Sequence, residues 1–195
     1  MDIKIIRSKR KTLAVQVGSG GVVVRAPLRA TDEEIDKFIA GHESWIEKHY
    51  QKVTESRKEI DNSEPLTYGD INELADKALK VIPERVEYYA KKIGVTYGKI
   101  TIRSQKSRWG SCSSTGNLNF NCLLMLTPPE VIDSVVVHEL CHRKEMNHSE
   151  RFYAEVLRVY PDYKKWDKWL KTNGKVLIGR MEKGKDTDSC PAYNA

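Results

Sequence analysis

The sequence lacks any apolar run of the roughly 18 residues that a transmembrane helix requires. It also lacks a small-residue cleavage site after its first residues, Met1–Arg7, which alternate like a β-strand. No internal repeat or low-complexity segment is present in the 195 residues. These absences argue against membrane, secreted, collagen-like and coiled-coil proteins. Hydrophobic residues make up 39% of the chain, enough for a core, so we expect a cytoplasmic, globular protein of one domain with a small extension.

Cysteine is scarce, and no two cysteines form a C-x-x-C pair. The chain has Cys112, Cys122, Cys141 and Cys190, too few in this length for a disulfide framework. We expect free thiols. A bridge between Cys112 and Cys122 is the one local alternative.

A large excess of one charge is absent as well. The 33 basic and 27 acidic residues give a net charge of +6, and the isoelectric point is about 9.0. A short basic run, Lys9–Lys11, stands out, but most basic residues are scattered among acids. Contact with nucleic-acid backbone usually needs a concentrated basic stripe, so the charge indicates such a partner only weakly.

Residues 1–62 are expected to form an N-terminal lobe of a β-hairpin and a long helix. Two apolar strands flank the glycine-rich turn Gly18–Gly21, which is typical of a hairpin. Thr31 and Glu34 form a predicted capping box that opens the helix. Apolar residues at helical spacing continue it as far as His49. We expect His42 and His49 to be partly buried beside Trp45 rather than to bind a metal.

Residues 63–178 are expected to form the main domain, because the sequence turns polar between Ser56 and Gly69. A helix is predicted up to Gly94, kinked or restarted at Pro83, and is followed by short strands at 100–102 and 118–122. Thr127 and Glu130 form a predicted capping box for a helix over 129–146. Further helices follow, and residues 179–195 are expected to form a polar tail.

One motif dominates the sequence: the H-E-x-x-H run from His138 to His142. Positions i and i+4 lie on one helix face, so both imidazoles can bind one ion. Glu139 lies about 100° around the helix, where it can reach a metal-bound water rather than the metal. A catalytic zinc usually has three protein ligands and keeps the fourth position for that water.

His148 is the expected third ligand, because it follows His142 at the offset of the third histidine in metzincins. Asn147 is predicted to break the helix and, with Glu150, to cap the next one. Other residues could supply the third ligand instead: Glu145, Glu150 and Glu155. A zinc held only for stability, or no metal at all, also stays open.

Several segments together resemble the YgjP-like predicted metallopeptidase family. They are Arg103, Lys106–Cys112, His138–His142, Asn147–Ser149 and Phe152. The resemblance implies a zincin-like fold with distant similarity to SprT-like and Wss1-like DNA-associated proteases. The family is described as zinc-dependent peptidases and, in some naming, as nucleoside triphosphate (UTP) pyrophosphatases, and the resemblance implies the same two alternatives here.

The W-G-S-C segment of that resemblance suggests where a substrate binds. In zincins an edge strand beside the metal-bearing helix pairs with extended substrate through main-chain hydrogen bonds. Trp109–Ser113 or Asn117–Asn121 could provide it, which makes Ser111 and Asn119 candidate substrate contacts. Trp109 is another candidate, although core packing is its commoner role.

Arg103 and Arg108 could bind a carboxylate or a phosphate, and with Lys106 they are the only basic cluster near the motif in the sequence. A nucleotide pyrophosphatase would need such a cluster and usually binds magnesium through carboxylates.

These observations predict an α+β, zincin-like fold in which a small mixed sheet packs on the metal-bearing helix. The predicted function is a zinc-dependent hydrolase that acts as a peptidase, with Zn²⁺ on His138, His142 and His148 and Glu139 as general base. A UTP pyrophosphatase and a nucleic-acid-associated module with a structural zinc are the alternatives. A peptide or protein is the expected substrate, no membrane partner is expected, and the oligomeric state stays open.

Overall fold

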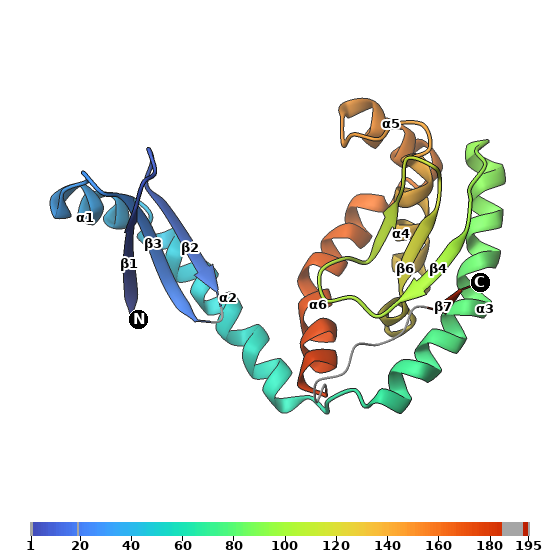
Figure 1. The fold of residues 1–195 in the computed structure, drawn as a ribbon, viewed down its shortest axis with the longest axis horizontal. Coiled ribbons are helices and arrows are strands. Elements are labelled where there is room, and N and C mark those ends of the chain that lie inside the picture. The colour runs from blue at the N-terminus through green and yellow to red at the C-terminus, as the bar shows by residue number, and fades with distance from the viewer. Residues whose placement is uncertain (1, 19, 185–192, 195) are drawn as a thin grey trace. The chain divides into compact units, whose positions relative to one another are not determined.

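The structure is a computed structural model that describes residues 2–18, 20–184 and 193–194. The chain divides into two compact units, Met1–Ser63 and Glu64–Ala195 (Figure 1). No helix among the described residues is long and apolar enough to cross a bilayer. Cys112, Cys122 and Cys141 are free thiols, as predicted, and Cys190 lies outside the described residues.

The N-terminal unit consists of a three-stranded sheet and two helices. Its strands are β1 (Ile3–Ser8), β2 (Ala14–Gly18) and β3 (Gly21–Pro27), and its helices are α1 (Asp32–Ala40) and α2 (Glu43–Asn62). β2 and β3 form the predicted antiparallel hairpin, and β1 adds to β3 in parallel. Alternate residues of β3 point into a small apolar core that also receives Ile35 of α1.

The single helix predicted from Thr31 to His49 is in fact two helices. The capping box is present, because Thr31 Oγ1 accepts a hydrogen bond from Glu34 N and the Glu34 carboxylate accepts one from Thr31 N. However, α1 ends at Gly41 and α2 begins after His42, so the apolar stripe is interrupted. His49 is partly buried and stacks on Trp45 as predicted, whereas His42 is exposed.

The second unit contains a four-stranded mixed sheet in the order β5-β6-β4-β7. Its strands are β4 (Ile100–Arg103), β5 (Gly110–Cys112), β6 (Leu118–Asn121) and β7 (Tyr193–Asn194). β4 and β6 run parallel, and the two outer strands pair antiparallel to them. β5 is therefore an edge strand, and β6 lies inside the sheet. The predicted strand over 118–122 stops at Asn121, because Cys122 begins a short 3₁₀ helix, η1 (Cys122–Leu126).

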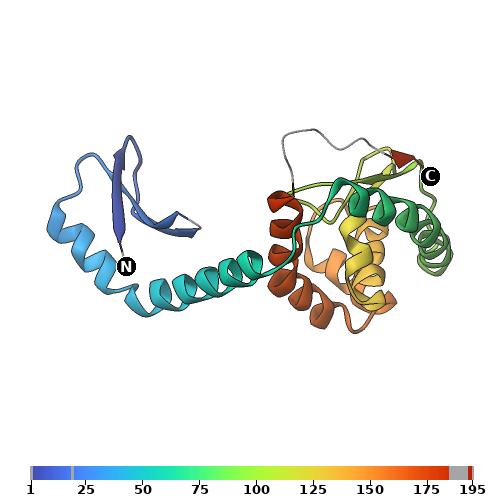
Figure 2. The same cartoon turned by 90° about the horizontal axis from the view of Figure 1, so that it is seen from below.

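Four α-helices complete this unit, and α4 lies between α3 and α6 in both views (Figures 1 and 2). They are α3 (Tyr68–Ile93), α4 (Pro129–Cys141), α5 (Glu150–Val159) and α6 (Tyr163–Lys183). α3 continues through Pro83 without a restart and ends at Gly94, whose φ of 78° suits the left-handed conformation of a helix cap. The core is built from α3, α4, η1 and the inner sheet face.

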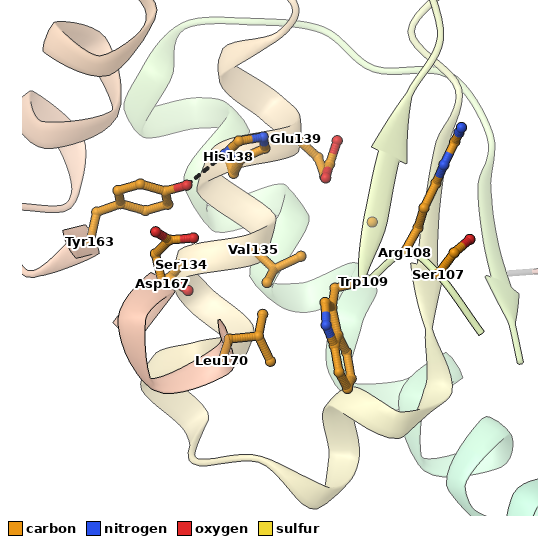
Figure 3. Close-up of a pocket in the computed structure, with 11 residues that line it drawn as sticks. Ser107, Arg108, Trp109, Ser134, Val135, His138, Glu139, Tyr163, Asp167 and Leu170 are labelled. Carbon is orange, nitrogen blue, oxygen red and sulfur yellow. Dashed lines mark hydrogen bonds between the residues drawn. The ribbon is translucent and has the colours of Figure 1, made fainter. Parts of the chain in front are cut away.

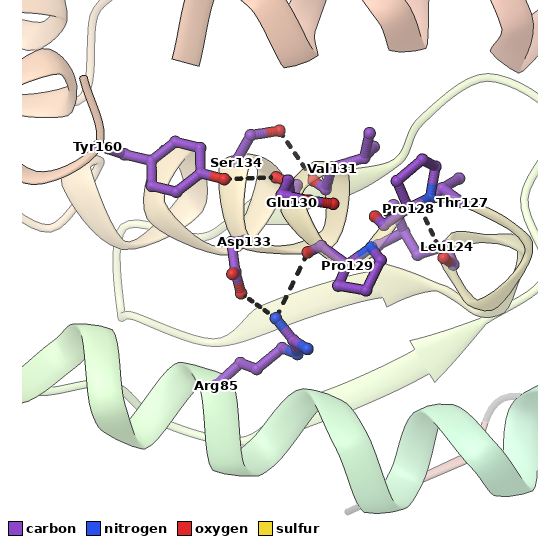
Figure 4. Close-up of polar contacts among 10 residues, drawn as sticks. All are labelled: Arg85, Leu124, Thr127, Pro128, Pro129, Glu130, Val131, Asp133, Ser134 and Tyr160. Atoms are coloured by element: carbon purple, nitrogen blue, oxygen red, sulfur yellow. Dashed lines mark hydrogen bonds and ion pairs between the residues drawn. The ribbon is translucent and has the colours of Figure 1, made fainter. Parts of the chain in front are cut away.

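The start of α4 is fixed by side chains of neighbouring elements (Figure 4). Arg85 of α3 forms an ion pair with Asp133, and the hydroxyl of Tyr160 donates to the carbonyl oxygen of Glu130 at 3.1 Å. The predicted capping box is absent, because the Thr127 hydroxyl donates to the carbonyl of Leu124 and closes η1 instead. Tertiary contacts therefore anchor this helix where a local cap was predicted.

The fold class is confirmed as α+β, with a small mixed sheet packed beside the helix that carries the H-E-x-x-H motif. The C-terminal segment differs from the prediction. α6 continues to Lys183, five residues into the predicted tail, and its end is held by a hydrogen bond from Leu66 N to Arg180 O. Of the remaining residues, Tyr193 and Asn194 pair with β4.

Candidate metal centre

Three histidines converge at the C-terminal end of α4. His138 lies in the last turn of the helix, His142 is the first residue after it, and His148 precedes α5. Their ligand atoms all lie within 4.8 Å of one another, and the Nε2 atoms of His138 and His148 are 3.0 Å apart. The sequence prediction of this triad therefore corresponds to a group of side chains that could hold one metal ion.

The outer nitrogen of two of these rings is already engaged. His138 Nδ1 is 2.8 Å from the hydroxyl of Tyr163, and His142 Nδ1 is 3.1 Å from the carbonyl oxygen of Glu145 (Figure 3 shows the first contact). A neutral imidazole that donates Nδ1–H to such an acceptor keeps the Nε2 lone pair for a metal. These contacts thus favour the tautomer that metal binding needs.

Burial keeps the same rings uncharged. It lowers the pKa of His138 to about 3, with smaller contributions from the neighbouring His142 and His148. Burial also lowers the pKa of His142. A metal competes with protons for an imidazole, so neutral rings are ready to bind at physiological pH.

The alternative carboxylate ligands are not part of this group. Glu155 is paired with Lys144 at 2.6 Å and with Arg158 at 2.7 Å, and Glu145 contributes only its backbone carbonyl to His142. Among the described residues that gather around His138, the donor set is three imidazoles. Zinc accepts such a set readily, whereas magnesium prefers oxygen ligands.

The chain around His148 departs from the prediction. α4 ends at Cys141 rather than near Met146, and Ser149, not Asn147, caps α5 by accepting a hydrogen bond from Phe152 N. His148 therefore lies in the connecting segment, ahead of the next helix.

Glu139 is buried against the edge strand. Only 6% of it is exposed, and a Cβ atom added at Gly110 of β5 would lie 2.6 Å from its Oε1 atom. Gly110 thus provides the space that the carboxylate occupies. Burial raises the pKa of Glu139 to about 8, and the positive charge of Arg108 opposes that rise. A cation on the histidines would oppose it further.

Of the two segments predicted as an edge strand, Trp109–Ser113 contains one: β5, formed by Gly110, Ser111 and Cys112, is the outer strand of the sheet. The alternative segment, Asn117–Asn121, includes the interior strand β6. β5 lies beside α4 and leaves one edge without a strand partner in the described sheet. An extended peptide could pair with that edge.

The candidate substrate contacts fall into two groups. Arg108 and Ser111 line the hollow that contains the three histidines, and Trp109 lines an adjoining cavity beside His138 and Glu139. By contrast, Asn119 accepts a hydrogen bond from Arg103 Nε at 3.0 Å and donates one to Ser111 Oγ at 3.1 Å.

That chain of side chains lies on the outer face of the sheet. Ser111 alternates with Gly110, which faces Glu139, so the Ser111 side chain and the Asn119 side chain bonded to it point away from α4, and Ser111 lines the hollow through its main chain. Arg103 and Asn119 therefore belong to the outer face. Lys106, the third member of the predicted basic cluster, pairs with Glu182 at 3.4 Å.

Three residues that support the site were missed in the sequence. Gly110 and Tyr163 are described above, and Asn121 is fully buried. The Asn121 amide donates to the carbonyl oxygens of Gln105 at 2.7 Å and Arg108 at 2.9 Å, which fixes the loop leading into β5. Asn121 could have been found in the sequence, because asparagine is a favoured N-cap residue and Asn121 caps η1. No local sequence pattern indicates the role of Tyr163.

Three convergent imidazoles beside a buried glutamate and an edge strand define a candidate metal-dependent hydrolase centre. The chain belongs to the YgjP-like family, since the family model "YgjP-like, metallopeptidase domain" matches residues 11–73 and 71–173. The resemblance stated from the motifs is thereby confirmed.

Curated proteins and solved structures give two further comparisons. No curated protein matches it. Among solved structures, it is similar to the crystal structure of the metallopeptidase zymogen of Pyrococcus abyssi abylysin, with 23% identity and a TM-score of 0.43 over 47% of this chain and 93% of that one.

Proposed function

We propose that this protein is a zinc-dependent metallopeptidase. The observation that carries the proposal is the convergence of His138, His142 and His148, with the Nδ1 atoms of the first two held by neighbouring oxygens. Three neutral nitrogen ligands fit zinc and leave one coordination position open for catalysis. Membership in a metallopeptidase-domain family supports the same function.

Zinc, when bound, would polarise the scissile carbonyl and lower the pKa of a water. Glu139 then acts as general base: a carboxylate oxygen accepts a proton from the attacking water and later delivers it to the leaving amine. Gly110 leaves room for the carboxylate, because a Cβ atom there would overlap it. Tyr163 holds the His138 ring in one orientation.

The free edge of β5 binds the substrate in this proposal. Main-chain groups of Gly110–Cys112 would pair with an extended peptide and carry its backbone past Glu139. This mode of binding selects unfolded or extended polypeptide. It also explains why the W-G-S-C segment and the H-E-x-x-H motif occur together.

A nucleotide pyrophosphatase fits the site less well. Its magnesium would favour carboxylate ligands, and of the three predicted phosphate-binding side chains, Arg103 contacts Asn119 and Lys106 contacts Glu182. The third alternative, a nucleic-acid-associated module with structural zinc, would place no requirement on Glu139.

The test is the variant Glu139→Gln, with Glu150→Gln at an exposed position as matched control. Both variants and the parent protein are loaded with zinc, and zinc content is measured. Each is incubated with a peptide library and with a panel of nucleoside triphosphates, in zinc and in magnesium. We expect zinc-dependent peptide cleavage that falls about 10²- to 10⁴-fold in Glu139→Gln alone, with zinc content unchanged.

Pyrophosphate release that requires magnesium and survives the Glu139→Gln change would overturn the proposal. So would a zinc-loaded parent protein that cleaves no peptide in the library. Binding of DNA that weakens steeply with added salt, without any hydrolysis, would favour the nucleic-acid module.

A further inference from the structure

A second cavity adjoins the metal centre on the side of α6 (Figure 3). It has a volume of about 210 Å³, and it shares Arg108, Gly110, His138 and Glu139 with the hollow that contains the three histidines. It thus begins at the proposed general base and extends away from His142 and His148. No step of the proposed reaction uses it.

The inner part of this cavity is apolar. Trp109 comes from the loop before β5, Val135 from α4 and Leu170 from α6, and Figure 3 shows these three side chains around the lower part of the cavity. Val135 and Leu170 are only 7% and 8% exposed, so the cavity wall is part of the packed core.

Trp109 is held in position by α6. A Cβ atom added at Gly174 would lie 2.7 Å from Trp109 Cζ2, so the indole packs directly on the helix backbone at that glycine. Since three different elements fix the three apolar side chains, the cavity is formed before any ligand enters. A preformed apolar cavity binds without a large ordering cost.

Two polar side chains of the cavity wall, Asp167 and Tyr163, already have partners. Asp167 accepts a hydrogen bond from Lys171 at 2.6 Å, and the Tyr163 hydroxyl contacts His138 Nδ1. An acidic ligand side chain would face both Glu139 and Asp167, whereas the cationic side chain of the lining, Arg108, points away from Trp109 and Leu170 (Figure 3). A basic one would have to share Asp167 with Lys171 and lose its own hydration against Trp109 and Leu170.

We propose that this cavity is the pocket that selects one apolar side chain of the substrate, of the size of leucine, methionine or phenylalanine. The inference rests on the proposed peptidase function. A substrate strand on β5 turns alternate side chains toward α4, and the residue next to the scissile bond then faces the cavity. The volume suits one such side chain, because an apolar cavity of about 150 Å³ already holds benzene.

The first test is a peptide library in which each position around the cleavage site carries every residue type except cysteine. Cleavage by the zinc-loaded protein is read by mass spectrometry. We expect a preference for leucine, methionine or phenylalanine at one position flanking the cleaved bond, with kcat/KM at least about 10-fold higher for leucine than for alanine there. A charged preference, or none at either flanking position, would overturn the inference.

The second test changes the size of the cavity. Leu170→Phe reduces it and should move the preference toward alanine and valine, whereas Leu170→Ala enlarges it and should favour phenylalanine and tryptophan. Leu157→Ala removes the same atoms at a partly buried position on α5 that packs against the core outside this cavity, and it should keep the parent preference. If either Leu170 variant fails to fold, Val135→Ala serves as the enlarged cavity. Preferences that do not differ from those of Leu157→Ala would overturn the inference.

A binding measurement separates this inference from the proposed function. N-acetyl-leucine amide and N-acetyl-aspartate amide are titrated into the metal-free protein, and the indole signal of Trp109 is followed by NMR. We expect a shift with the leucine derivative that Leu170→Phe abolishes. If the parent protein cleaves no peptide, the peptidase function is refuted, but the Trp109 shift still shows whether the cavity binds a leucine side chain. Peptide cleavage without any Trp109 response to the leucine derivative refutes the pocket and leaves the peptidase standing.

Discussion

Replacing Tyr163 by phenylalanine removes the hydroxyl that lies 2.8 Å from His138 Nδ1 and leaves the ring packing in place. Tyr163 is only 6% exposed, and burial raises its pKa well above the usual value, so the hydroxyl is un-ionised at neutral pH. When His138 Nε2 binds a metal, its proton lies on Nδ1 and needs an acceptor. In the Tyr163→Phe variant that buried N–H has lost its partner.

The size of the effect follows from that loss. Leaving a buried donor unsatisfied costs about 1–3 kcal/mol, and each 1.4 kcal/mol is a factor of ten in an equilibrium constant. The metal-free protein avoids part of this cost, since the His138 proton can move to Nε2. The lost hydrogen bond therefore costs more in the zinc-bound variant than in the metal-free one. We expect zinc affinity to weaken about 10- to 100-fold, as is usual when the partner of a metal-binding histidine is removed.

The assay is zinc competition against a chromophoric chelator, with thermal unfolding in excess EDTA as a separate measure of metal-free stability. Tyr160→Phe is the matched control, because its hydroxyl also bonds to α4 but at the opposite end, on the Glu130 carbonyl. We expect Tyr160→Phe to lower stability and leave zinc affinity unchanged. A Tyr163→Phe variant that binds zinc within twofold of the parent, or an equal loss in the control, would refute the reasoning.

Three further predictions concern neighbouring residues. Gly110→Ala should retain zinc but lose at least about 100-fold in peptide cleavage, because the new Cβ would lie 2.6 Å from Glu139 Oε1; normal cleavage would show that the carboxylate needs no such space. His148→Ala should weaken zinc binding in the competition assay far more than Glu155→Ala, since only the histidine belongs to the ligand group; an equal loss would contradict that assignment. Hydrogen bonds from Arg158 and then Lys144 lower the pKa of Glu155 to about 2 from its ordinary 4.5. Their contribution to stability, about 1 kcal/mol, is thus present above pH 4.5 and lost as the pH falls toward 2. Urea unfolding of the parent and of Glu155→Gln should accordingly differ at pH 7 and converge only as the pH falls to 2 and below, and a constant difference would refute the sign.

The metal ligands could be predicted from the sequence because their geometry is mostly local. Two histidines four residues apart on one helix share a face in any protein that forms that helix, and the alternation along β6 (Leu118–Asn121) is equally local. Tyr163 lies 25 residues after His138, and only the packing of α6 against α4 brings them together. The cavity is likewise formed from three elements that are distant in the sequence.

The largest local error, the end of α4, shows what tertiary contacts add. A helix continued from His142 to Met146 and beyond would place residue 148 about 15 Å along the axis from His138, out of its reach. Instead the chain turns after Cys141, where Arg143 donates to the carbonyls of Thr96 and Ser114 across the sheet. The turn has backbone hydrogen bonds of its own, from Arg143 N to Leu140 O and from Lys144 N to Cys141 O at 3.0 Å each, and it returns His148 Nε2 to within 3.0 Å of His138 Nε2. The third ligand is therefore supplied because the helix ends early, and residues that never touch the metal determine where it ends.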